Sequence, residues 1–229
     1  MSVTPQIHKG PSLLSRLPEH FVSELFNDAT PAKLNADEVL FLAGDDGDGC
    51  YRIEDGLLKV TMVSRAGTER ILAFLGPGTI VGELSMIDGR PRSASVVAVR
   101  AARLSFLSRA AFQDFAAQHP EIYKSLVTLI AGRLRETDAA VAAGSFLPLR
   151  GRVAVTLLEL AQEFGQDVGS GRTVIHQKIG QSDLAAMAGV ARENVSRILN
   201  DWQRRKLVSR FSGYYCLENT AKLQIEAEL

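Results

Sequence analysis

The stretch "VGELSMIDGRPRSAS", residues Val81–Ser95, combines a glycine, a carboxylate and an arginine–serine pair. A glycine such as Gly82 before a helical turn leaves backbone N–H groups unpaired, and these attract anions. Arg92 can add a bidentate pair to a phosphate, and Ser93 a hydroxyl. A plain phosphate site has no use for Glu83, but a carboxylate can accept a hydrogen bond from a hydroxyl beside the phosphate. The ribose 2′-hydroxyl of a cyclic nucleotide is such a group.

The same residues have a plainer interpretation. In it, Glu83 and Arg92 form a surface ion pair that caps a turn, and no ligand is needed. The sequence leaves both interpretations open.

The composition is that of an ordinary globular protein of 229 residues, 46% hydrophobic and 23% charged. This length fits two domains of modest size. No apolar run approaches the ~20 residues that span a bilayer, and residues 1–17 lack the apolar core of a signal peptide. We therefore expect a cytoplasmic protein without a membrane partner. The 26 basic residues balance the 26 acidic ones, so a nucleic-acid function must rest on local clustering.

Metal-binding and redox-active side chains are few and scattered. Cys50 and Cys216 lie far apart without CxxC spacing, and the four histidines are dispersed. This pattern argues against a disulfide scaffold, a zinc site or a Cys-ligated iron–sulfur cluster. No nucleophile stands with a base, so we expect neither a metal nor an enzymatic activity.

From about Val39 to Leu107 the chain has the pattern of short strands punctuated by glycines. Val-, Ile-, Leu- and Phe-rich segments alternate with glycines at short intervals, which favour turns. Gly49 and Gly56 are among these expected turns. The spacing predicts a compact all-β sandwich or barrel.

A long helix is expected from about Glu121 to Ala143, after a shorter helix that starts near Ser108 and is interrupted at Pro120. Its apolar positions advance by alternating steps of four and three residues: Tyr123, Val127, Ile130, Leu134, Thr137, Val141 and Gly144. Such a heptad seam suits pairing with the same helix of a second chain. The alternative is a core helix packed within its own subunit. Thr137 is the polar member and costs stability unless it finds a partner.

The segment "GSFLPLRG", Gly144–Gly151, ends this periodicity and predicts a hinge between domains. Pro148 is unfavourable inside a helix but favourable in a first turn. A smaller helical domain follows, in which "RVAVTLLELAQEFG" is a helix ended by Gly165 and "QDVGSGRT" is a loop.

"QSDLAAMAGVARENVSRIL", Gln181–Leu199, has the spacing of a helix-turn-helix. Ser182 is the expected N-cap of the first helix, Gly189 supplies the positive φ of the turn, and Ala185 is small where the helices cross. The expected core between the helices consists of Leu184, Ala188, Val190, Val195 and Ile198.

The second of these helices presents polar residues away from that core: Arg192, Glu193, Asn194, Ser196 and Arg197. Arginine suits the O6 and N7 acceptors of guanine, glutamate can accept from cytosine N4, and asparagine can serve bases or phosphates. Arg204–Lys206 and Arg210 add charge within reach of phosphates, and a β-hairpin is expected to turn at Ser212–Gly213. The alternative is a generic pair of surface-charged helices.

The segment Val81–Ser95 closely resembles the phosphate-binding cassette of cyclic-nucleotide-binding domains. Together with the long helix and a C-terminal winged helix, the chain resembles the CRP/FNR family of bacterial transcription regulators from about Leu13 to Glu218. The resemblance implies an α+β fold: a cyclic-nucleotide-binding β-roll (jelly-roll) with flanking helices at 1–120, a dimerisation helix and hinge at 121–146, and a winged helix-turn-helix DNA-binding domain at 147–229.

By that resemblance, five cassette residues would hold the ribose and cyclic phosphate: Gly82, Glu83, Leu84, Arg92 and Ser93. The pocket would be walled by Val60, Ala73 and Leu75, and the dimer seam would use Val127, Ile130, Leu134 and Val141. Thr137 would contact the base, and Asp138 falls where one family member has a serine that reaches the other subunit's ligand. Because an aspartate can only accept hydrogen bonds, both cAMP and cGMP stay open, and we favour cAMP.

The second helix of the helix-turn-helix resembles the readout helix of the family. Arg192, Glu193 and Arg197 match its base-reading positions, which implies a TGTGA-like half-site in an inverted repeat; Asn194 and Ser182 complete the expected DNA contacts. Pro148 departs from the acidic helix cap common at the family's hinge.

The chain also lacks the N-terminal cysteine cluster of the family's oxygen-sensing branch. The expected function is a homodimeric, cyclic-nucleotide-dependent (cAMP, alternatively cGMP) transcriptional regulator that binds double-stranded DNA and RNA polymerase. The alternative is a regulator of this type that binds DNA without a cyclic nucleotide or senses another anionic metabolite.

Overall fold

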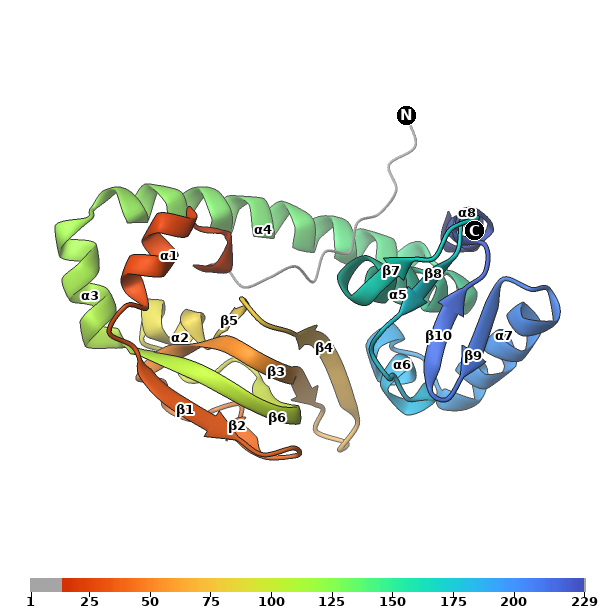
Figure 1. Cartoon of the computed structure of the whole chain (residues 1–229), viewed down its shortest axis with the longest axis horizontal. Coiled ribbons are helices and arrows are strands. Elements are labelled where there is room, and N and C mark those ends of the chain that lie inside the picture. Colours follow the sequence, from red (N-terminus) through yellow and green to blue (C-terminus); the bar gives the residue numbers. More distant parts are fainter. Residues whose placement is uncertain (1–13, 229) are drawn as a thin grey trace. The chain divides into compact units, whose positions relative to one another are not determined.

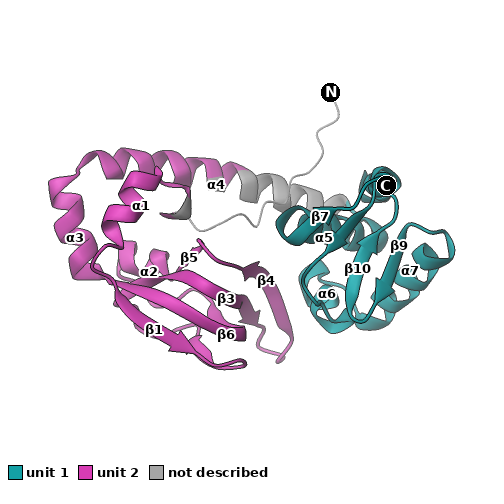
Figure 2. Ribbon diagram, in the orientation of Figure 1, with its two compact units in different colours: residues 1–8, 136–229 teal, residues 9–135 magenta. Residues whose placement is uncertain are grey.

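A computed structural model describes the backbone of residues 14–228, and their side chains except at 15, 133 and 136–146. It divides into two compact units (Figure 2). Among the described residues, the first unit takes in residues 14–135 and the second residues 136–228. The division falls inside the long helix α4 (Glu121–Phe146).

The first unit is an antiparallel β-roll flanked by helices (Figure 1). Besides α4, its helices are the 3-10 turn η1 (Leu14–Arg16), α1 (Glu19–Leu25), α2 (Glu83–Asp88) and α3 (Arg109–Gln118). Its strands are β1 (Thr30–Leu34), β2 (Val39–Phe41), β3 (Gly49–Val63), β4 (Glu69–Leu75), β5 (Ile80–Val81) and β6 (Ser95–Ser108). They are joined in the order β1-β6-β3-β4, with β2 also on β6 and β5 on β3.

The two long strands β3 and β6 form the spine of this sheet, which corrects the expectation of short strands only. Gly49 and Gly56 do not form the turns expected of them: Gly49 begins β3 and Gly56 lies inside it, at a bulge where the register with β6 shifts on both sides. Gly56 has a φ of 103°, and a Cβ there would lie 2.5 Å from the carbonyl oxygen of Ala101. The glycine therefore lets a long strand bend and coil instead of ending it.

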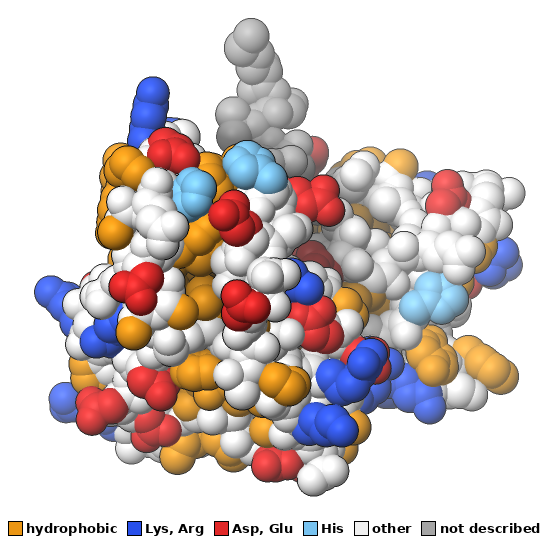
Figure 3. Space-filling model, turned by 60° about the vertical axis from the view of Figure 1, so that its left-hand side comes forward, with side chains coloured by type: hydrophobic (Ala, Val, Ile, Leu, Met, Phe, Trp, Pro, Cys, Tyr) orange, Lys and Arg blue, Asp and Glu red, His pale blue; other side chains and the backbone are white. Residues whose placement is uncertain are grey.

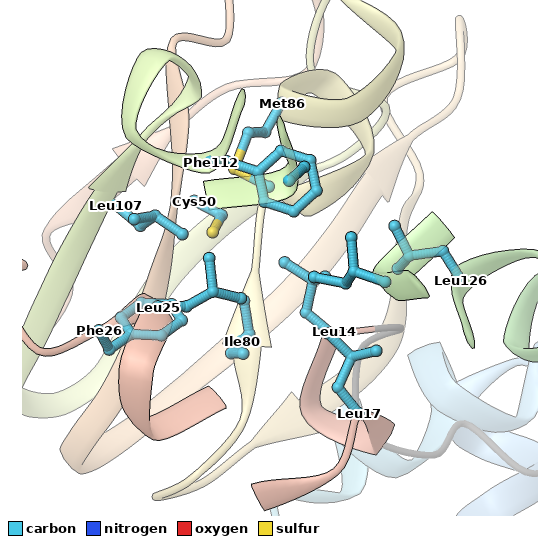
Figure 4. Packing of buried hydrophobic residues seen from close by; sticks show 12 residues of the cluster. Leu14, Leu17, Leu25, Phe26, Cys50, Ile80, Met86, Leu107, Phe112 and Leu126 are labelled. Carbon is cyan, nitrogen blue, oxygen red and sulfur yellow. The ribbon is translucent and has the colours of Figure 1, made fainter. Parts of the chain in front are cut away.

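Two clusters of buried side chains stabilise the first unit. One fills the interior of the roll and is made of Leu34, Ile53, Leu58, Leu75, Val81, Val96, Ala98, Ala102 and Leu104. The other lies between the sheet and the helices, where side chains from η1, α1, β3, β5, α2, β6, α3 and α4 point toward one another (Figure 4). Each fully buried aliphatic side chain contributes about 1.5–3 kcal/mol, so this second cluster fixes α2 and the start of α4 on the roll.

Helix α4 carries two apolar stripes. Ile122 and Leu126 are 0% and 3% exposed and belong to the second cluster. The predicted seam is on the other stripe: Tyr123, Val127, Ile130 and Leu134 are 48–66% exposed. The described part of the seam is therefore not packed within its own subunit, contrary to the intrasubunit alternative. The side chains of Thr137, Asp138, Val141 and Gly144 lie outside the described residues.

Besides the end of α4, the described part of the second unit contains four helices and a small sheet. The helices are α5 (Leu149–Phe164), α6 (Gln181–Ala188), α7 (Arg192–Arg204) and α8 (Thr220–Glu228). The strands are β7 (Gly165–Asp167), β8 (Thr173–Ile175), β9 (Val208–Phe211) and β10 (Tyr214–Leu217), in the order β7-β8-β10-β9. The expected α+β architecture, a β-roll followed by a smaller and mostly helical unit, is present.

Three local expectations need correction in this half of the chain. The helix α4 continues through Gly144 to Phe146, and the break falls at Leu147–Pro148, where Pro148 (φ −64°) is the N-cap of α5. The segment expected to be a loop, "QDVGSGRT", includes the end of β7 and the first residue of β8, which pair with each other. The C-terminal helix α8 was not predicted.

The face of the molecule drawn in Figure 3 carries side chains of both charges. On the face drawn in Figure 3, acidic and basic side chains are interspersed and hydrophobic ones appear between them. No helix in the described part of the chain is long and apolar enough to cross a membrane.

Candidate nucleotide-binding and DNA-binding sites

The cassette glycine Gly82 is required by both its backbone and its surroundings. It precedes α2 with a φ of 85°, in the left-handed region that favours glycine. A Cβ at this position would lie 2.5 Å from Nη1 of Arg92 and 3.3 Å from the Phe41 ring. A larger residue would therefore displace the arginine. Because α2 has only six residues, its own dipole is small and the arginine is the main cationic element.

Arg92 is buried, with 5% of its surface exposed. Its Nη1 donates to the carbonyl oxygens of Gly49 (2.8 Å) and Gly82 (2.7 Å), and its guanidinium carbon lies 4.3 Å from the centre of the Phe41 ring. These contacts fix the plane of the guanidinium group. They hold the side chain in one orientation.

The opposite edge of the same guanidinium group consists of Nε and Nη2. Nε is buried and finds no acceptor among the described residues, while Nη2 is 3.8 Å from the exposed carboxylate of Asp48, beyond hydrogen-bond range. Burial lowers the pKa of Arg92, against the effect of Tyr51 and Asp48, which raise it. An arginine nevertheless stays charged, so this desolvated cation has two adjacent donors free for an oxyanion.

Glu83 and Arg92 are both 5% exposed, so neither lies at the surface where the alternative interpretation of the sequence placed them. Glu83 lies close enough to Cys50 to raise the pKa of that thiol, after burial, which is the larger cause. Leu84 is 41% exposed and Ser93 is also exposed. The cassette thus combines a buried carboxylate and a buried arginine with an accessible leucine and serine.

The three predicted wall residues lie together on the inner side of the roll. Val60 and Ala73 face each other across β3 and β4, and both are half-buried against the inner cluster, to which Leu75 belongs. Apolar side chains that are only partly covered suit one face of a ligand.

The residues present fit a cyclic phosphate. A guanidinium fork with Nε and Nη2 free matches two phosphate oxygens, and the buried Arg92 Nε that lacks an acceptor is the observation that indicates an anion. Arg92 would hold the phosphate and Glu83 the ribose hydroxyl. Thr137 and Asp138, expected to reach the base, have side chains outside the described residues. Among the described residues, no group of three or more His, Cys, Asp or Glu side chains could hold a metal ion.

The helix-turn-helix forms as expected in the second unit. Gly189 ends α6 with a φ of 63° and a ψ of 42°, which confirms the predicted turn. Of the predicted core, Leu184, Ala188, Val195 and Ile198 are 0–7% exposed, and Val190 is half-buried. Arg152 of α5 donates from Nη1 to the carbonyl oxygen of Gly189 at 3.3 Å, so the turn is also held from outside.

The predicted base-reading side chains are accessible. Arg192, Glu193 and Arg197 are exposed, whereas Asn194 is half-buried. The Asn194 side-chain oxygen accepts a hydrogen bond of 2.7 Å from Nη2 of Arg197, one helical turn away. Asn194 therefore orients Arg197 in the ligand-free chain.

Ser182 is not the N-cap that the sequence predicted. The helix α6 begins at Gln181 and its N-cap is Gly180, whose N–H donates to the Asp183 carboxylate at 3.1 Å. Asp183 supplies the side-chain cap from the third helical position, which leaves the exposed Ser182 free of that role. Its contact with DNA stays a prediction.

The predicted hairpin turns at Ser212–Gly213, where both residues have positive φ, 50° and 90°. Phe211 beside this turn is 83% exposed. Nζ of Lys178 lies 5.3 Å from the centre of the Tyr214 ring. The tip of the wing therefore presents aromatic and cationic groups.

A charged cluster that the sequence analysis missed joins three helices of the second unit. Arg150 of α5 contacts Asp201 of α7 at 2.7 Å and Glu226 of α8 at 3.0 Å. Arg205, the C-cap of α7, contacts the same two carboxylates at 3.4 Å and 2.6 Å. The partners are up to 76 residues apart, so only the folded chain brings them together. The cluster fixes the C-terminal end of the candidate readout helix.

Two families match this chain in the order that the fold shows. Residues 31–119 match the cyclic nucleotide-binding domain. Residues 151–225 match the Crp-like helix-turn-helix domain. The first match contains the whole cassette, and the second contains α6, α7 and the wing.

Curated relatives are similar over most of the chain. A CRP-like cAMP-activated global transcriptional regulator of Mycobacterium tuberculosis is 33% identical over 207 residues, which cover 90% of this chain and 89% of the relative. The cyclic AMP receptor protein of Thermus thermophilus is 38% identical over 161 residues, 70% of this chain and 71% of the relative.

Solved structures agree with these matches. The catabolite activator protein of Thermus thermophilus is 31% identical, with a TM-score of 0.52 over 94% of this chain and 98% of its own. FixK2 from Bradyrhizobium japonicum shares the fold, with a TM-score of 0.73 at 20% identity over 86% of this chain and 96% of its own. The Mycobacterium relative is named as a transcriptional regulator, and the chain belongs to the CRP/FNR family of transcriptional regulators.

Proposed function

We propose that this protein is a homodimeric transcriptional regulator whose DNA binding depends on a cyclic nucleotide, cAMP in the first place and cGMP as the alternative. The ligand binds the cassette with its phosphate on Arg92 and its ribose on Glu83. The rest of the phosphate and ribose site is formed by Gly82, Leu84 and Ser93. The apolar side of the pocket is formed by Val60, Ala73 and Leu75. The base reaches Thr137 and Asp138.

The observation that carries this proposal is the hydrogen bonding of Arg92. Nη1 is used by two carbonyl groups, whereas the buried Nε has no acceptor in the described part of the chain. A buried donor without a partner costs about 1–3 kcal/mol, and a ligand phosphate removes that cost. A cyclic nucleotide also carries a ribose hydroxyl beside that phosphate, and the carboxylate of the buried Glu83 can accept a hydrogen bond from it.

The exposed stripe of α4 supports the homodimer. Val127 and Leu134 are 66% and 60% exposed, with Tyr123 and Ile130 on the same stripe. A heptad row of exposed apolar residues is stabilised by pairing with a second copy. Val141 continues the same spacing and joins this proposed seam.

The exposed Arg192, Glu193 and Arg197 support sequence-specific DNA binding. In a two-fold dimer the two α7 helices read half-sites of an inverted repeat about 34 Å apart, and the family resemblance gives the half-site as TGTGA-like. The ligand promotes binding because it prefers the DNA-competent arrangement of the dimer. We also propose a cytoplasmic location and RNA polymerase as a further partner, since regulators of this family act on transcription.

Titration calorimetry with cAMP and cGMP tests the proposal. We expect saturable heat with one nucleotide per subunit, and no heat with adenosine, which lacks the phosphate that Arg92 binds. Absence of heat with both cyclic nucleotides would favour another anionic metabolite. Formation of a linear nucleotide during the titration would indicate an enzyme, and none is expected.

A further inference from the structure

Arg109 lies at the N-terminus of α3, which is an unfavourable position for a cation. It is the first residue of α3, whose first turn contains no acidic side chain. A positive charge at a helix N-terminus is disfavoured by the helix dipole. The Arg109 side chain is half-buried, and its Nε finds no acceptor among the described residues. Something else must therefore hold the guanidinium group where it lies.

Two backbone carbonyl groups hold it. Nη2 of Arg109 donates to the carbonyl oxygen of Gly47 at 2.5 Å and to that of Ser85 at 2.6 Å. The backbone N–H of Arg109 also donates to the Asp48 carbonyl oxygen at 2.7 Å. Gly47 and Asp48 belong to the loop before β3, and Ser85 to the cassette helix α2. Arg109 thus binds both segments at once.

The loop of residues 44–49 lies directly against the cassette. Gly44 and Arg92 are joined by a backbone hydrogen bond of 2.8 Å, and Arg92 and Asp45 by a second of the same length. A Cβ on Gly47 would lie 2.4 Å from Cβ of Ser85 and 3.1 Å from the guanidinium carbon of Arg92. The loop therefore limits the position of the Arg92 side chain. A shift of the loop would move the Nε–Nη2 edge of Arg92.

Arg92 and Arg109 make similar contacts. Each donates to one carbonyl oxygen of residues 44–49 and to one carbonyl oxygen in or next to α2. Arg92 joins Gly49 of the loop to Gly82 before α2, and Arg109 joins Gly47 of the loop to Ser85 within α2. The proposed phosphate contact is on the Nε–Nη2 edge of Arg92, where the buried Nε has no acceptor among the described residues. Through its hydrogen bonds to Gly47 and Ser85, Arg109 joins the loop to α2 a second time. These two hydrogen bonds do not involve the ligand.

We propose that Arg109 is a positioning residue of the nucleotide site, which braces the 44–49 loop and α2 so that the Nε–Nη2 edge of Arg92 stays aligned with the ligand phosphate. Because Arg109 begins α3, the brace also ties the cassette to the helix that precedes α4. This inference rests on the proposed function as far as the ligand is concerned. The brace itself exists without ligand and can be tested alone.

The first test measures hydrogen exchange in the ligand-free protein. We compare the wild type with Arg109→Met, Arg109→Lys and the control Arg103→Met, which removes an exposed arginine of β6 whose Nε forms an ion pair of 3.6 Å with the exposed carboxylate of Asp55. We expect faster exchange at the amides of residues 44–49 and 85–89 in Arg109→Met. Arg109→Lys should restore part of the protection, and Arg103→Met should match the wild type. Equal exchange in Arg109→Met and the wild type would overturn the brace.

The second test measures cAMP binding and its stereochemistry. We expect Arg109→Met to bind cAMP about tenfold more weakly, about 1.4 kcal/mol, because two hydrogen bonds that align Arg92 are lost. We also compare the two phosphorothioate diastereomers of cAMP, in which sulfur replaces one or the other exocyclic oxygen. A fixed arginine edge distinguishes them, so their affinity ratio should move toward one in Arg109→Met and recover in Arg109→Lys. A ratio unchanged in Arg109→Met would contradict a positioning role.

The outcomes separate the two proposals. If the wild type binds no cyclic nucleotide but exchange in the 44–49 loop depends on Arg109, the proposed function fails and the brace stands. If the wild type binds cAMP and both Arg109 variants behave like it, the brace fails and the function stands. If Arg109→Met does not fold, the loop exchange and the diastereomer ratio of Arg109→Lys decide, with intermediate values expected and wild-type values contradicting the brace.

Discussion

Nη1 of Arg92 donates a hydrogen bond of 2.7 Å to the carbonyl oxygen of Gly82, the residue whose left-handed conformation starts the cassette helix. Arg92 therefore also stabilises the backbone of the site in which it would bind the phosphate. Its position is fixed by the backbone and by the Phe41 ring, and ligand binding does not have to order it. A preorganised group of this kind gives affinity at a lower entropic cost.

Replacing Arg92 should abolish nucleotide binding more than it affects folding. In Arg92→Gln the affinity for cAMP should fall about a hundredfold or more, since charge-assisted hydrogen bonds contribute about 1.5–3 kcal/mol each. The matched control is Arg90→Gln, an exposed arginine of the same segment, which should bind cAMP almost as the wild type does. Calorimetry gives both affinities, and circular dichroism checks the fold. Equal affinities of Arg92→Gln and the wild type would refute the assigned role of Arg92.

A charge placed in the seam of α4 should dissociate the dimer. Val127→Glu puts a carboxylate in the middle of the exposed apolar stripe, where pairing would bury it without a partner. Thr128→Glu introduces the same charge at the next exposed position outside that stripe. Analytical ultracentrifugation should give a monomer for Val127→Glu and a dimer for Thr128→Glu. A dimer in both would place the subunit contact elsewhere.

The readout helix makes two kinds of DNA contact that mutation can separate. Arg192→Ala should lose about 1–3 kcal/mol on the specific duplex and much less on a scrambled one, because it removes a base contact. Arg204→Ala, at the other end of α7, should weaken both duplexes alike and reduce the salt dependence. Fluorescence anisotropy measures all four affinities. Uniform weakening by Arg192→Ala would make it a phosphate contact instead.

Acid should destabilise the second unit through the cluster around Glu226. Burial raises the pKa of Glu226, but hydrogen bonds from Arg150 and Arg205 outweigh it, so its pKa lies below the usual value. The hydrogen bond from Arg150 is the main cause that lowers the pKa of Asp201. A folded pKa below the unfolded one stabilises the protein above the unfolded value, about 4.3 for Glu and 3.9 for Asp, and this stabilisation is lost as the pH falls through the folded values.

The measurement uses Trp202, the single tryptophan, which is fully buried in the second unit. Denaturant unfolding followed by its fluorescence should show Glu226→Gln about 1–2 kcal/mol less stable than the wild type at pH 7. The difference should shrink toward pH 3. The control Glu228→Gln changes an exposed residue two positions away and should have little effect at either pH. A difference independent of pH would show that the charge of Glu226 is not what stabilises α8.

Local patterns in the sequence predicted much of this architecture. The heptad spacing on α4, the turn glycine Gly189 and the hairpin at Ser212–Gly213 each depend on residues close together in the chain, and each is present. Gly56 was misassigned because a glycine in a bulge and a glycine in a turn look alike in sequence, and only the pairing of β3 with β6 distinguishes them. Ser182 was misassigned as a cap because Asp183 competes for the same helix end.

The contacts of Arg92, Arg109 and Arg150 could not be predicted in the same way. Each joins segments tens of residues apart, and most of their acceptors are backbone carbonyl groups, which carry no sequence signal. The cassette sequence suggested that Arg92 binds an anion. Which of its nitrogen atoms are already used, and which are free, follows only from the fold.

The central claim is tested most directly by the affinity of the purified protein for an inverted-repeat duplex of TGTGA-like half-sites, measured by anisotropy with and without saturating cAMP. The account predicts tighter binding with the nucleotide, by about 5- to 150-fold, the range typical of allosteric coupling, and no such gain in Arg92→Gln. Equal affinity with and without both cAMP and cGMP would contradict it.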